Sequence, residues 1–303
     1  MSISKINKVI ELSEKILKGK KERVQLVLAN ILANGHTLIE DSPGVGKTTL
    51  VKYLGKALDL NISRIQFTND ILPADIIGTS IFNKAENRFD FHKGPLFGEL
   101  ILADELNRAP PKTQSALLQA MEERSISIEG NNFKLPPYFT VIATQNPNIQ
   151  IGTFDLPESQ LDRFSMKIAM GYADKNSTIL LLKEINQSEI LTNQKSIINK
   201  EELMIMQSQI NDVHIEDSIY EKIYQILEVS RNDSSYISLS NRCGLDLVKL
   251  SKVWAILNDR NYVIPDDLYY LFSYVAGHRL VSPENSDINY ETKISKKLLE
   301  QVK

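Results

Sequence analysis

The sequence has a single cysteine, a single tryptophan and no long apolar run, and these absences exclude several classes of protein. Cys243 has no second cysteine with which to form an intramolecular disulfide. The four histidines lie far apart, with no metal-ligand spacing between them: His36, His92, His214 and His278. No stretch approaches the ~20 apolar residues that span a bilayer. Charges in the N-terminal segment MSISKINKVIELSEK interrupt any signal-peptide core. We therefore expect a cytoplasmic protein that is not inserted in a membrane.

The charge balance argues against a protein whose main partner is nucleic acid or acidic lipid. The formal net charge is −3 and the pI is near 5.9, so bulk electrostatic attraction to phosphate is missing. A local basic patch stays possible. The 303 residues, 42% of them hydrophobic and 24% charged, can bury one large core or two moderate ones.

The first part of the chain alternates strands and helices. Helical spacing of apolar residues predicts two helices within residues 3–33, broken at Gly19. HTLIE, a glycine loop and KTTLVKYLGKALDL then indicate a strand, a turn and a helix. Further apolar runs at ISRIQF, LILA and FTVIATQ alternate with helical segments. This alternation predicts an α/β fold with a mainly parallel sheet and helices on both of its faces.

Two β-hairpins that project from the sheet layer and a helical C-terminal half complete the expected organisation. SISIEGNNFKL predicts a β-hairpin, and SIFNKAENRFDFHKG predicts a second one. After about residue 175 periodic helices replace strands, which predicts a separate helical bundle. We assign residues 1–180 to a core domain, 181–200 to a polar linker and 201–303 to the helical domain.

A glycine loop between the first strand and its helix predicts a phosphate site. Gly44 and Gly46 let successive backbone N–H groups face inward, and the helix that follows adds the positive end of its dipole. Lys47 would reach the β and γ phosphates. Asp41 stands where the usual pattern has its first glycine. The residues expected to bind nucleotide are Ser42, Pro43, Gly44, Val45, Gly46, Lys47, Thr48 and Thr49.

An apolar strand that ends in two carboxylates supplies the matching catalytic groups. We expect Thr48 and Asp104 to hold Mg²⁺ and Glu105 to activate the attacking water. Strand alternation should point Asp104 and Glu105 in different directions. Guanine-binding proteins carry an NKxD element, but NKAE at Asn83 and NKEE at Asn199 both lack its aspartate. ATP is therefore the expected nucleotide.

In this order the motifs resemble those of the AAA+ ATPases, and of the MoxR family in particular. The resemblance covers roughly residues 20–282. It is carried by GHTLIEDSPGVGKTTL, RIQFTNDILPADIIG, FDFHKGPLF, ILADELNRAPPKTQSALLQAMEER, ATQNPN, LPESQLDRF and VIPDDLYYLFSYVAGHRL. It implies an AAA+ P-loop core with a five-stranded sheet and a C-terminal all-α lid domain. Asp41 matches the loop variant of MoxR-like proteins.

Three further roles follow from the resemblance. Asn146 resembles the sensor 1 residue, which would contact the γ-phosphate or the attacking water; without the resemblance, an Asn before Pro147 would be read as a turn former. Arg163 resembles an arginine finger acting on the neighbouring subunit, with an ion pair to Asp162 as the alternative. Arg242 falls where the family carries sensor 2, although the family's Ser-Pro-Arg is Ser-Asn-Arg here.

The resemblance also implies partners. An arginine finger acting between subunits requires a ring, commonly a hexamer in this superfamily. MoxR-like proteins are associated with proteins that carry a von Willebrand factor A domain, which suggests chaperone-like remodelling. A DNA-stimulated motor and a nucleotide-gated scaffold with little turnover remain alternatives. Nucleic acid is the less favoured partner, because neither hairpin carries a clear basic stripe.

Three aromatic residues and the cysteine are assigned to structure instead of chemistry. Trp254, Tyr269 and Tyr270 lie at helical spacing among apolar neighbours, so we expect them in the lid core. Arg242 beside Cys243 could lower the pKa of its thiol, but one thiol without a resolving partner is usually inert.

Overall fold

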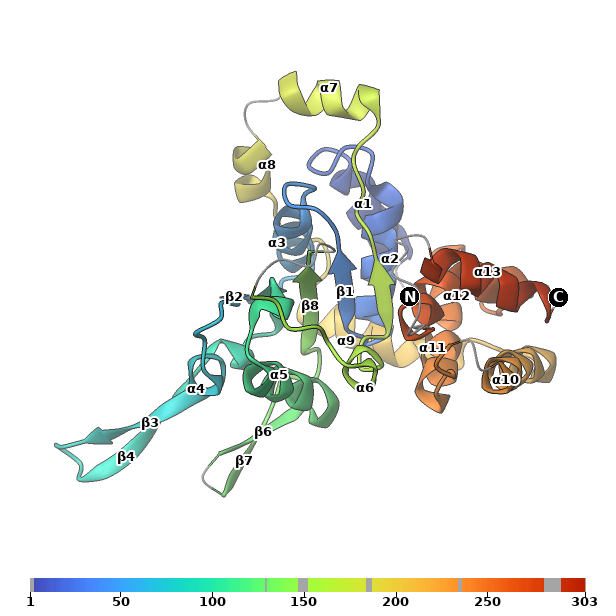
Figure 1. Ribbon diagram of the computed structural model, residues 1–303. Helices are drawn as coiled ribbons and strands as arrows, with labels where there is room; N and C mark the ends of the chain where they lie inside the picture. The colour runs from blue at the N-terminus through green and yellow to red at the C-terminus, as the bar shows by residue number, and fades with distance from the viewer. Residues whose placement is uncertain are drawn as a thin grey trace.

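A computed structural model gives the fold of the chain (Figure 1). It describes residues 3–128, 130–146, 152–183, 187–233, 236–280 and 290–302. The end of the motif ATQNPN, beyond Asn146, lies outside the described residues.

Five parallel strands form the central sheet. They are β1 (Thr37–Glu40), β2 (Ile62–Gln66), β5 (Leu100–Asp104), β8 (Thr140–Gln145) and β9 (Met166–Ile168). Their order across the sheet is β2, β5, β8, β1 and β9, and every neighbouring pair is parallel. The predicted parallel sheet is confirmed. All five strands therefore end at one side, called here the carboxyl end of the sheet, and begin at the other, the amino end.

Both faces of the sheet are buried at its centre, which explains the unbroken apolar run Leu-Ile-Leu-Ala of β5. On β5, Leu100 and Leu102 belong to one apolar cluster while Ile101 and Ala103 belong to another, as the period of two requires. The first cluster includes α1 (Ile3–Ser13), α2 (Lys21–Leu32) and α3 (Lys47–Ala57), and the second includes α4 (Pro73–Ile77) and α5 (Pro111–Glu123). Helices thus cover both faces.

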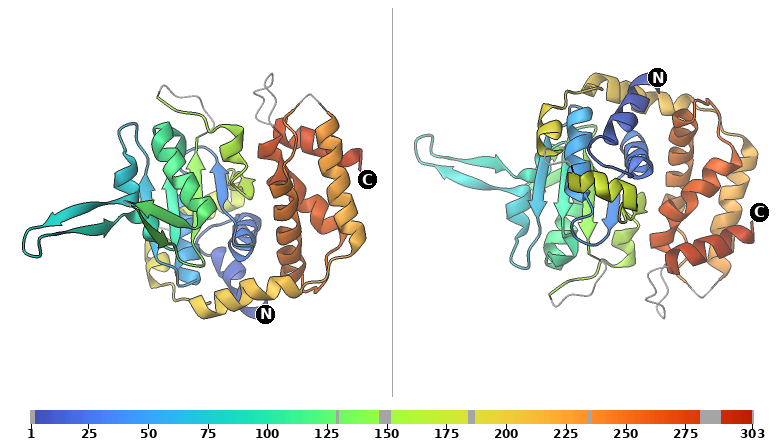
Figure 2. Two further views of the ribbon diagram at one scale, coloured as in Figure 1. Left: turned by 90° about the horizontal axis from the view of Figure 1, so that it is seen from below. Right: turned by 90° about the horizontal axis from the view of Figure 1, so that it is seen from above.

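Both predicted hairpins are present. They are formed by β3 (Gly78–Asn83) with β4 (Arg88–Lys93), and by β6 (Ser125–Ile128) with β7 (Asn131–Lys134). Phe91 of the first hairpin stacks on Phe133 of the second, with ring centroids 5.0 Å apart. Figure 2 shows the longer hairpin extending away from the helical half of the molecule.

Helices make up the rest of the described chain after β9. They are α7 (Lys175–Lys183), α8 (Gln187–Asn193), α9 (Lys200–Gln209), α10 (Asp217–Asn232), α11 (Asn241–Leu257), α12 (Pro265–Ala276) and α13 (Tyr290–Glu300). Two short 3-10 helices lie in this half, η3 (Ile210–Asp212) and η4 (Gly277–Arg279). Earlier in the chain are η1 (Pro95–Phe97), η2 (Leu106–Arg108) and the short helix α6 (Glu158–Leu161). Helix α8 occupies much of the segment predicted to be a linker. Within the described ranges, no helix combines the length and the apolar character needed to cross a bilayer.

The predicted C-terminal helical half is present, and it shares one continuous apolar cluster with the N-terminal helices. Residues of α2, α11 and α12 belong to the same buried cluster. Helix α2 is buried on most of its surface because it packs against α11 on one side and belongs to the core of the sheet on the other. As predicted, Trp254 lies in the lid core, stacked on Tyr270 at 4.7 Å, and Tyr269 packs against the same cluster.

Cys243 corrects one expectation. Its thiol is buried, and burial raises the pKa of Cys243 to about 11. The neighbouring Arg242 therefore does not make it reactive, which agrees with the absence of a proposed redox role.

Candidate nucleotide site

The glycine loop lies at the carboxyl end of the sheet, between β1 and α3. Gly44 and Gly46 have φ values of 83° and 97°, a region that glycine adopts without strain. A Cβ on Gly44 would meet nothing within 4 Å, so a side chain there would project into open space beside the loop. Helix α3 begins at Lys47 and directs the positive end of its dipole at the loop. The loop has the form of an anion cradle.

Lys47 is buried beneath this loop. Its Nζ donates a hydrogen bond of 2.6 Å to the carbonyl oxygen of Asp41 and lies 3.5 Å from Oδ1 of Asn146. Burial lowers the pKa of Lys47, and the carboxylates of Asp41, Asp104 and Glu105 oppose that shift. The ammonium group is therefore fixed between the loop and the end of β8.

The two acidic residues are oriented by a threonine that sequence analysis missed. The Thr144 hydroxyl donates to Asp104 Oδ1 at 2.7 Å and accepts from the Glu105 backbone N–H at 2.9 Å. Glu105 lies beyond the strand in a left-handed conformation, with φ of 58°. A sharp turn, and not strand alternation as predicted, separates the directions of the two carboxylates.

Each carboxylate also has a cationic partner that was not predicted. Arg64 Nη2 lies 2.8 Å from Asp104 Oδ2. Oε2 of Glu105 accepts from Arg108 Nη1 at 2.9 Å and from Gln66 Nε2 at 3.3 Å. Gln66 and Asp104 are paired across β2 and β5, which brings these side chains to the same place.

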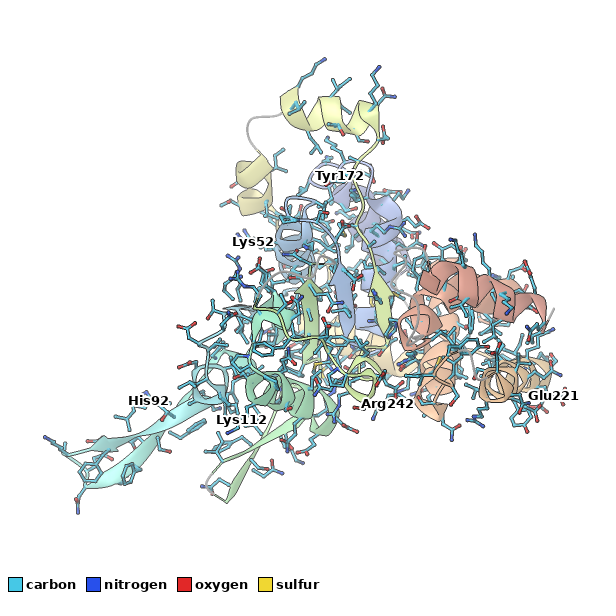
Figure 3. All side chains as sticks on the ribbon, viewed as in Figure 1. Lys52, His92, Lys112, Tyr172, Glu221 and Arg242 are labelled. Atoms are coloured by element: carbon cyan, nitrogen blue, oxygen red, sulfur yellow. The ribbon has the colours of Figure 1, made fainter. Side chains whose placement is uncertain are left out.

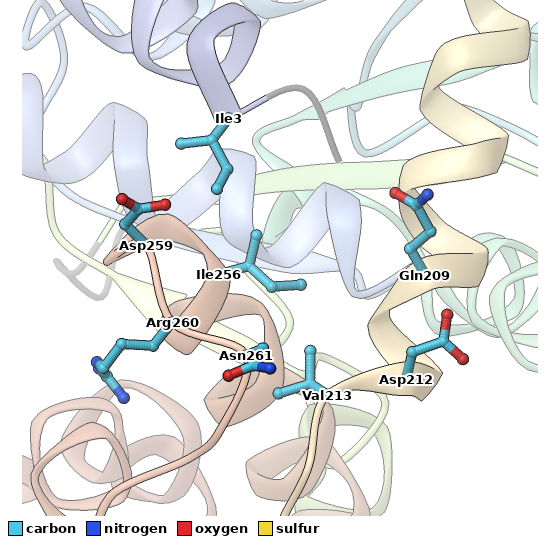
Figure 4. A pocket seen from close by; sticks show the side chains of 8 residues that line it. All are labelled: Ile3, Gln209, Asp212, Val213, Ile256, Asp259, Arg260 and Asn261. Atoms are coloured by element: carbon cyan, nitrogen blue, oxygen red, sulfur yellow. The ribbon is translucent and has the colours of Figure 1, made fainter.

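One cavity of about 430 Å³ lies far from this chemistry, between α1, η3 and the turn before α12 (Figure 4). It contains none of the predicted site residues. The glycine loop instead borders two other cavities.

The first cavity at the loop has a volume of about 320 Å³ and brings most of the predicted residues together. It is lined by Pro43, Gly44, Gly46, Lys47, Thr48, Thr49, Asp104, Glu105 and Asn146. Ser42 is not in this lining; its N–H donates to Asp41 Oδ1 instead.

The second cavity, of about 610 Å³, adjoins the first because both are lined by Gly44, Gly46, Thr48 and Thr49. Its other walls are mostly apolar, and of these residues only Val45 was predicted. They are Ile16, Leu17, Lys18, Lys20, Val45, Lys52, Leu181, Leu182 and Leu191. Apart from Val45 of the glycine loop, they come from the turn between α1 and α2, from α3 and from helices α7 and α8, so no local motif could have identified them.

The contacts of the Asp41 side chain show what this residue does at the position where the usual pattern has a glycine. Its Oδ2 accepts a 2.5 Å hydrogen bond from the N–H of Gly171, just after β9. Lys20 Nζ donates to the carbonyl oxygens of Met170 and Gly171 at 2.9 and 2.6 Å. The Asp41 side chain thus ties the glycine loop to the segment that leads into α7.

The remaining two predicted residues, Arg163 and Arg242, lie at the opposite end of the sheet. Met166, which starts β9, is paired with Thr37, which starts β1. Arg163 precedes β9 and therefore lies at the amino end, whereas the glycine loop follows the carboxyl end of β1. Figure 3 shows Arg242 near the lower end of the sheet, away from Lys52 of α3.

Both arginines contact the same carboxylate. Arg163 Nη1 lies 2.6 Å from Glu122 Oε2, and Arg242 Nη2 lies 2.7 Å from Glu122 Oε1. The alternative partner suggested for Arg163, Asp162, is wrong: Asp162 pairs with Arg279 at 2.9 Å and accepts from the Ser240 hydroxyl.

Comparisons with known proteins agree with this geometry. A sequence model described as the ATPase family associated with various cellular activities (AAA) matches residues 36–166, and an AAA lid domain matches residues 234–297. The chain is 42% identical to the uncharacterised protein YeaC of Bacillus subtilis, over 91% of this chain and 87% of that one. It is 35% identical to Chaperone MoxR1 of Mycobacterium tuberculosis, over 88% of this chain and 73% of that one.

A solved structure gives the same result for the fold. The crystal structure of a "putative ATPase" from Cytophaga hutchinsonii superposes with a TM-score of 0.90 at 35% sequence identity, covering 99% of this chain and 95% of that one.

Proposed function

Because this chain belongs to the MoxR family of AAA+ ATPases, we propose that it hydrolyses ATP with magnesium and thereby remodels or matures partner protein complexes. The observation that carries the proposal is the single cavity lined by Lys47, Thr48, Asp104, Glu105 and Asn146. These are the groups that phosphoryl transfer to water requires: a cation for the phosphates, oxygen ligands for a metal, and a base for the nucleophile.

The residues fit a magnesium ion that is bridged to a nucleotide. Thr48 and Asp104 supply the oxygen ligands that Mg²⁺ prefers and line the same cavity. In the described part of the chain, no group of three or more His, Cys, Asp or Glu side chains forms a site that could hold a metal by itself. A magnesium ion held by Thr48 and Asp104 would supply positive charge that stabilises the negative charge developing on the phosphates. Asp104 would exchange its contact with Arg64 or act through water.

The larger cavity suits the adenine base. Its leucine and isoleucine side chains offer an apolar surface beside the loop that would hold the phosphates. The NKxD element that selects guanine is missing from the sequence. ATP would therefore lie across both cavities, with its base against α7, α8 and the turn after α1.

Hydrolysis would depend on release of the Glu105 carboxylate. Its Oε2 accepts from both Arg108 and Gln66, so these two donors occupy the oxygen that would receive the proton. Turning away from them would allow Glu105 to accept a proton from the attacking water. Asn146, 3.5 Å from Lys47 Nζ, would hydrogen-bond the γ-phosphate or that water.

A head-to-tail ring, which we propose to be a hexamer, would complete the site. Arg163 and Arg242 lie at the amino end of the sheet, where they cannot reach the nucleotide of their own chain. In a closed ring the amino end of one subunit can face the carboxyl end of the next. We propose that both arginines act on the nucleotide of the neighbour.

The partner is proposed from family membership. A relative 35% identical to this chain is named Chaperone MoxR1. We propose that the ring acts on a client or on a protein with a von Willebrand factor A domain. The two hairpins, joined through Phe91 and Phe133, would move as one unit and are the candidate contact surface.

The test is to separate binding from turnover. In calorimetry, Glu105→Gln should bind ATP with Mg²⁺ as the wild type does, while its hydrolysis falls by ~10²-fold or more. Lys47→Ala should lose binding, and the matched control Lys56→Ala, on the same helix and bonded to the Thr192 carbonyl, should retain it. Equal, slow hydrolysis by wild type and Glu105→Gln would contradict the proposal and favour a nucleotide-gated scaffold.

A further inference from the structure

Glu122 joins two arginines that come from different parts of the fold. It lies near the end of α5, Arg163 lies between α6 (Glu158–Leu161) and β9, and Arg242 lies in the first turn of α11. Each carboxylate oxygen takes one guanidinium group, at 2.6 and 2.7 Å. The contact therefore connects the core and the lid as well as the two arginines.

Neighbouring contacts fix the same geometry. Arg163 Nη1 also donates to the carbonyl oxygen of Leu118 at 2.7 Å, one helical turn before Glu122. Arg163 Nε is buried and has no hydrogen-bond partner in the structure. Arg242 Nη1 lies 3.7 Å from Asp162, which the Ser240 hydroxyl and Arg279 hold in place. Arg163 is thus held on α5 with a donor still unused.

The carboxylate of Glu122 reduces the electrostatic repulsion between Arg163 and Arg242. Two guanidinium groups side by side repel each other, and a carboxylate between them offsets that repulsion. With Asp162, Arg279 and Asp246 included, the three arginines of this network face three carboxylates, so ion pairs hold the two guanidinium groups in place without a net charge. An anion that approaches the surface would meet both arginines already oriented.

We propose that Glu122 is a positioning residue for ATP hydrolysis in the neighbouring subunit, holding Arg163 and Arg242 together in the orientation that the neighbour's phosphates require. The inference rests on the proposed function, because it requires that both arginines act between subunits. Glu122 itself does not touch the nucleotide; it acts through the two arginines.

A purely structural role for Glu122 predicts a different outcome. The three side chains are 28–41% exposed, and ion pairs with that exposure contribute little to stability. The adjacent Glu123 provides a matched control, since it accepts from Gln119 on its own helix. A structural role would affect folding and leave the subunit mixing described below without effect.

The experiment uses Glu122→Gln, which keeps the shape of the side chain and removes its charge. The amide has one acceptor oxygen where the carboxylate has two, and it carries no charge, so the two arginines are no longer held on separate carboxylate oxygens. We expect kcat to fall ~10- to 100-fold, because displacement of a catalytic group by about 1 Å can cost 10²-fold in rate. The KM for ATP should change less than about 3-fold, since each chain binds nucleotide through its own loop. Glu123→Gln should behave as wild type.

Subunit mixing gives the decisive readout. Lys47→Ala subunits lack a working loop but keep intact arginines, so each one can complete the site of an adjacent Glu122→Gln subunit. Rings assembled from both should hydrolyse ATP faster than the average of the two separate preparations. The same mixture with Arg163→Ala in place of Glu122→Gln is the positive control.

Four results would overturn the proposal. Wild-type turnover by Glu122→Gln would exclude a positioning role. A defect that mixing does not relieve, while the Arg163→Ala mixture is relieved, would show that Glu122 acts within its own subunit. Ring assembly lost in Glu122→Gln but kept in Arg163→Ala would make Glu122 an interface residue. If the Arg163→Ala mixture itself gains nothing, the arrangement between subunits fails, and the role of Glu122 fails with it.

Discussion

The two ends of the central sheet hold their functional side chains in different ways. At the carboxyl end, Lys47 is buried and bonded to backbone, and the buried Thr144 orients both acidic residues. At the amino end, Arg163 and Arg242 are partly exposed and share one surface carboxylate. The comparison teaches that one chain brings the proposed nucleotide-binding groups together by itself, whereas the two arginines lie at the other end, where under the proposed ring arrangement they would act on a neighbour.

Removing an arginine from the amino end should give the largest effect and tests the comparison directly. Arginine fingers contribute 10³–10⁵ to turnover, so Arg163→Ala should lower kcat by ~10³-fold, which is about 4 kcal/mol. Calorimetric ATP binding should be unchanged because the loop is intact. Wild-type specific activity should also rise with protein concentration as rings form. Normal turnover by Arg163→Ala would show that the carboxyl end acts alone.

The second largest effect should be a loss of stability at low pH, caused by two buried histidines at the amino end. Burial lowers the pKa of His36 to about 3 and also that of His278 well below its ordinary value. Both lie at that end: His36 Nδ1 accepts from the Val141 N–H at 3.0 Å, and His278 bonds to the Phe164 carbonyl. In the unfolded chain both titrate near pH 6.5. Below that pH the unfolded state binds more protons, so stability falls as the pH falls towards the folded pKa.

Urea unfolding at pH 7.5 and 5.5 measures this dependence. Each buried histidine should remove about 1.4 kcal/mol of unfolding free energy, or about 3 kcal/mol for the pair. His36→Asn keeps an acceptor near Val141 and should lose about half of the pH dependence. Equal stability of the wild type at the two pH values would contradict the burial argument.

Thr144→Val tests the carboxyl end with a smaller expected effect. The change keeps the shape of the side chain but removes the hydroxyl that bonds to Asp104 and to the Glu105 N–H. Two lost hydrogen bonds, at ~1 to 1.5 kcal/mol each, should lower kcat ~10- to 100-fold with little change in ATP affinity.

The control for this change lies on the same strand. Thr140 is also buried on β8, but its hydroxyl donates to the Tyr138 carbonyl, away from the acidic residues. Thr140→Val should therefore keep the wild-type kcat. If both valine variants lose turnover equally, the effect comes from the strand and not from orientation of the acids.

The residues that the sequence singled out at the carboxyl end lie together because parallel strands end together. A loop after β1, an acidic pair after β5 and Asn146 after β8 had to meet once the sheet was known to be parallel. Thr144 and Gln66 were missed because their contacts depend on which residues are paired between strands. The apolar cavity was missed because its walls come from the turn after α1 and from α7 and α8, which no motif connects.

At the amino end the sequence suggested the arginines but not their partner. The sequence suggested Asp162 because that residue is adjacent to Arg163 in the chain. Glu122 instead contacts both arginines, because the last turn of α5 lies at that end of the sheet. The thiol of Cys243 was misjudged for the same reason: adjacency to Arg242 suggested a lowered pKa, and burial raises it. Contacts between distant segments, and burial, are the information that adjacency does not contain.

The smallest predicted effect concerns the larger cavity at the glycine loop, which we propose holds the adenine base. Helix α7 contributes to its lining, so this test includes α7 in the comparison. Leu182 is 80% exposed yet lines the cavity beside the glycine loop, so a bound base would cover apolar surface that is now in water. Covering ~40 Å² of it corresponds to about 1 kcal/mol, and Leu182→Ala should raise the Kd for ATP about 5-fold. Leu180→Ala is the matched control, because Leu180 is also exposed on α7 but lies outside the cavity lining. Calorimetry with ATP and Mg²⁺ separates the two variants, and kcat at saturating ATP should be unchanged in both. Equal affinities would mean that the base does not reach α7, and the carboxyl end would then bind nucleotide through its loop alone.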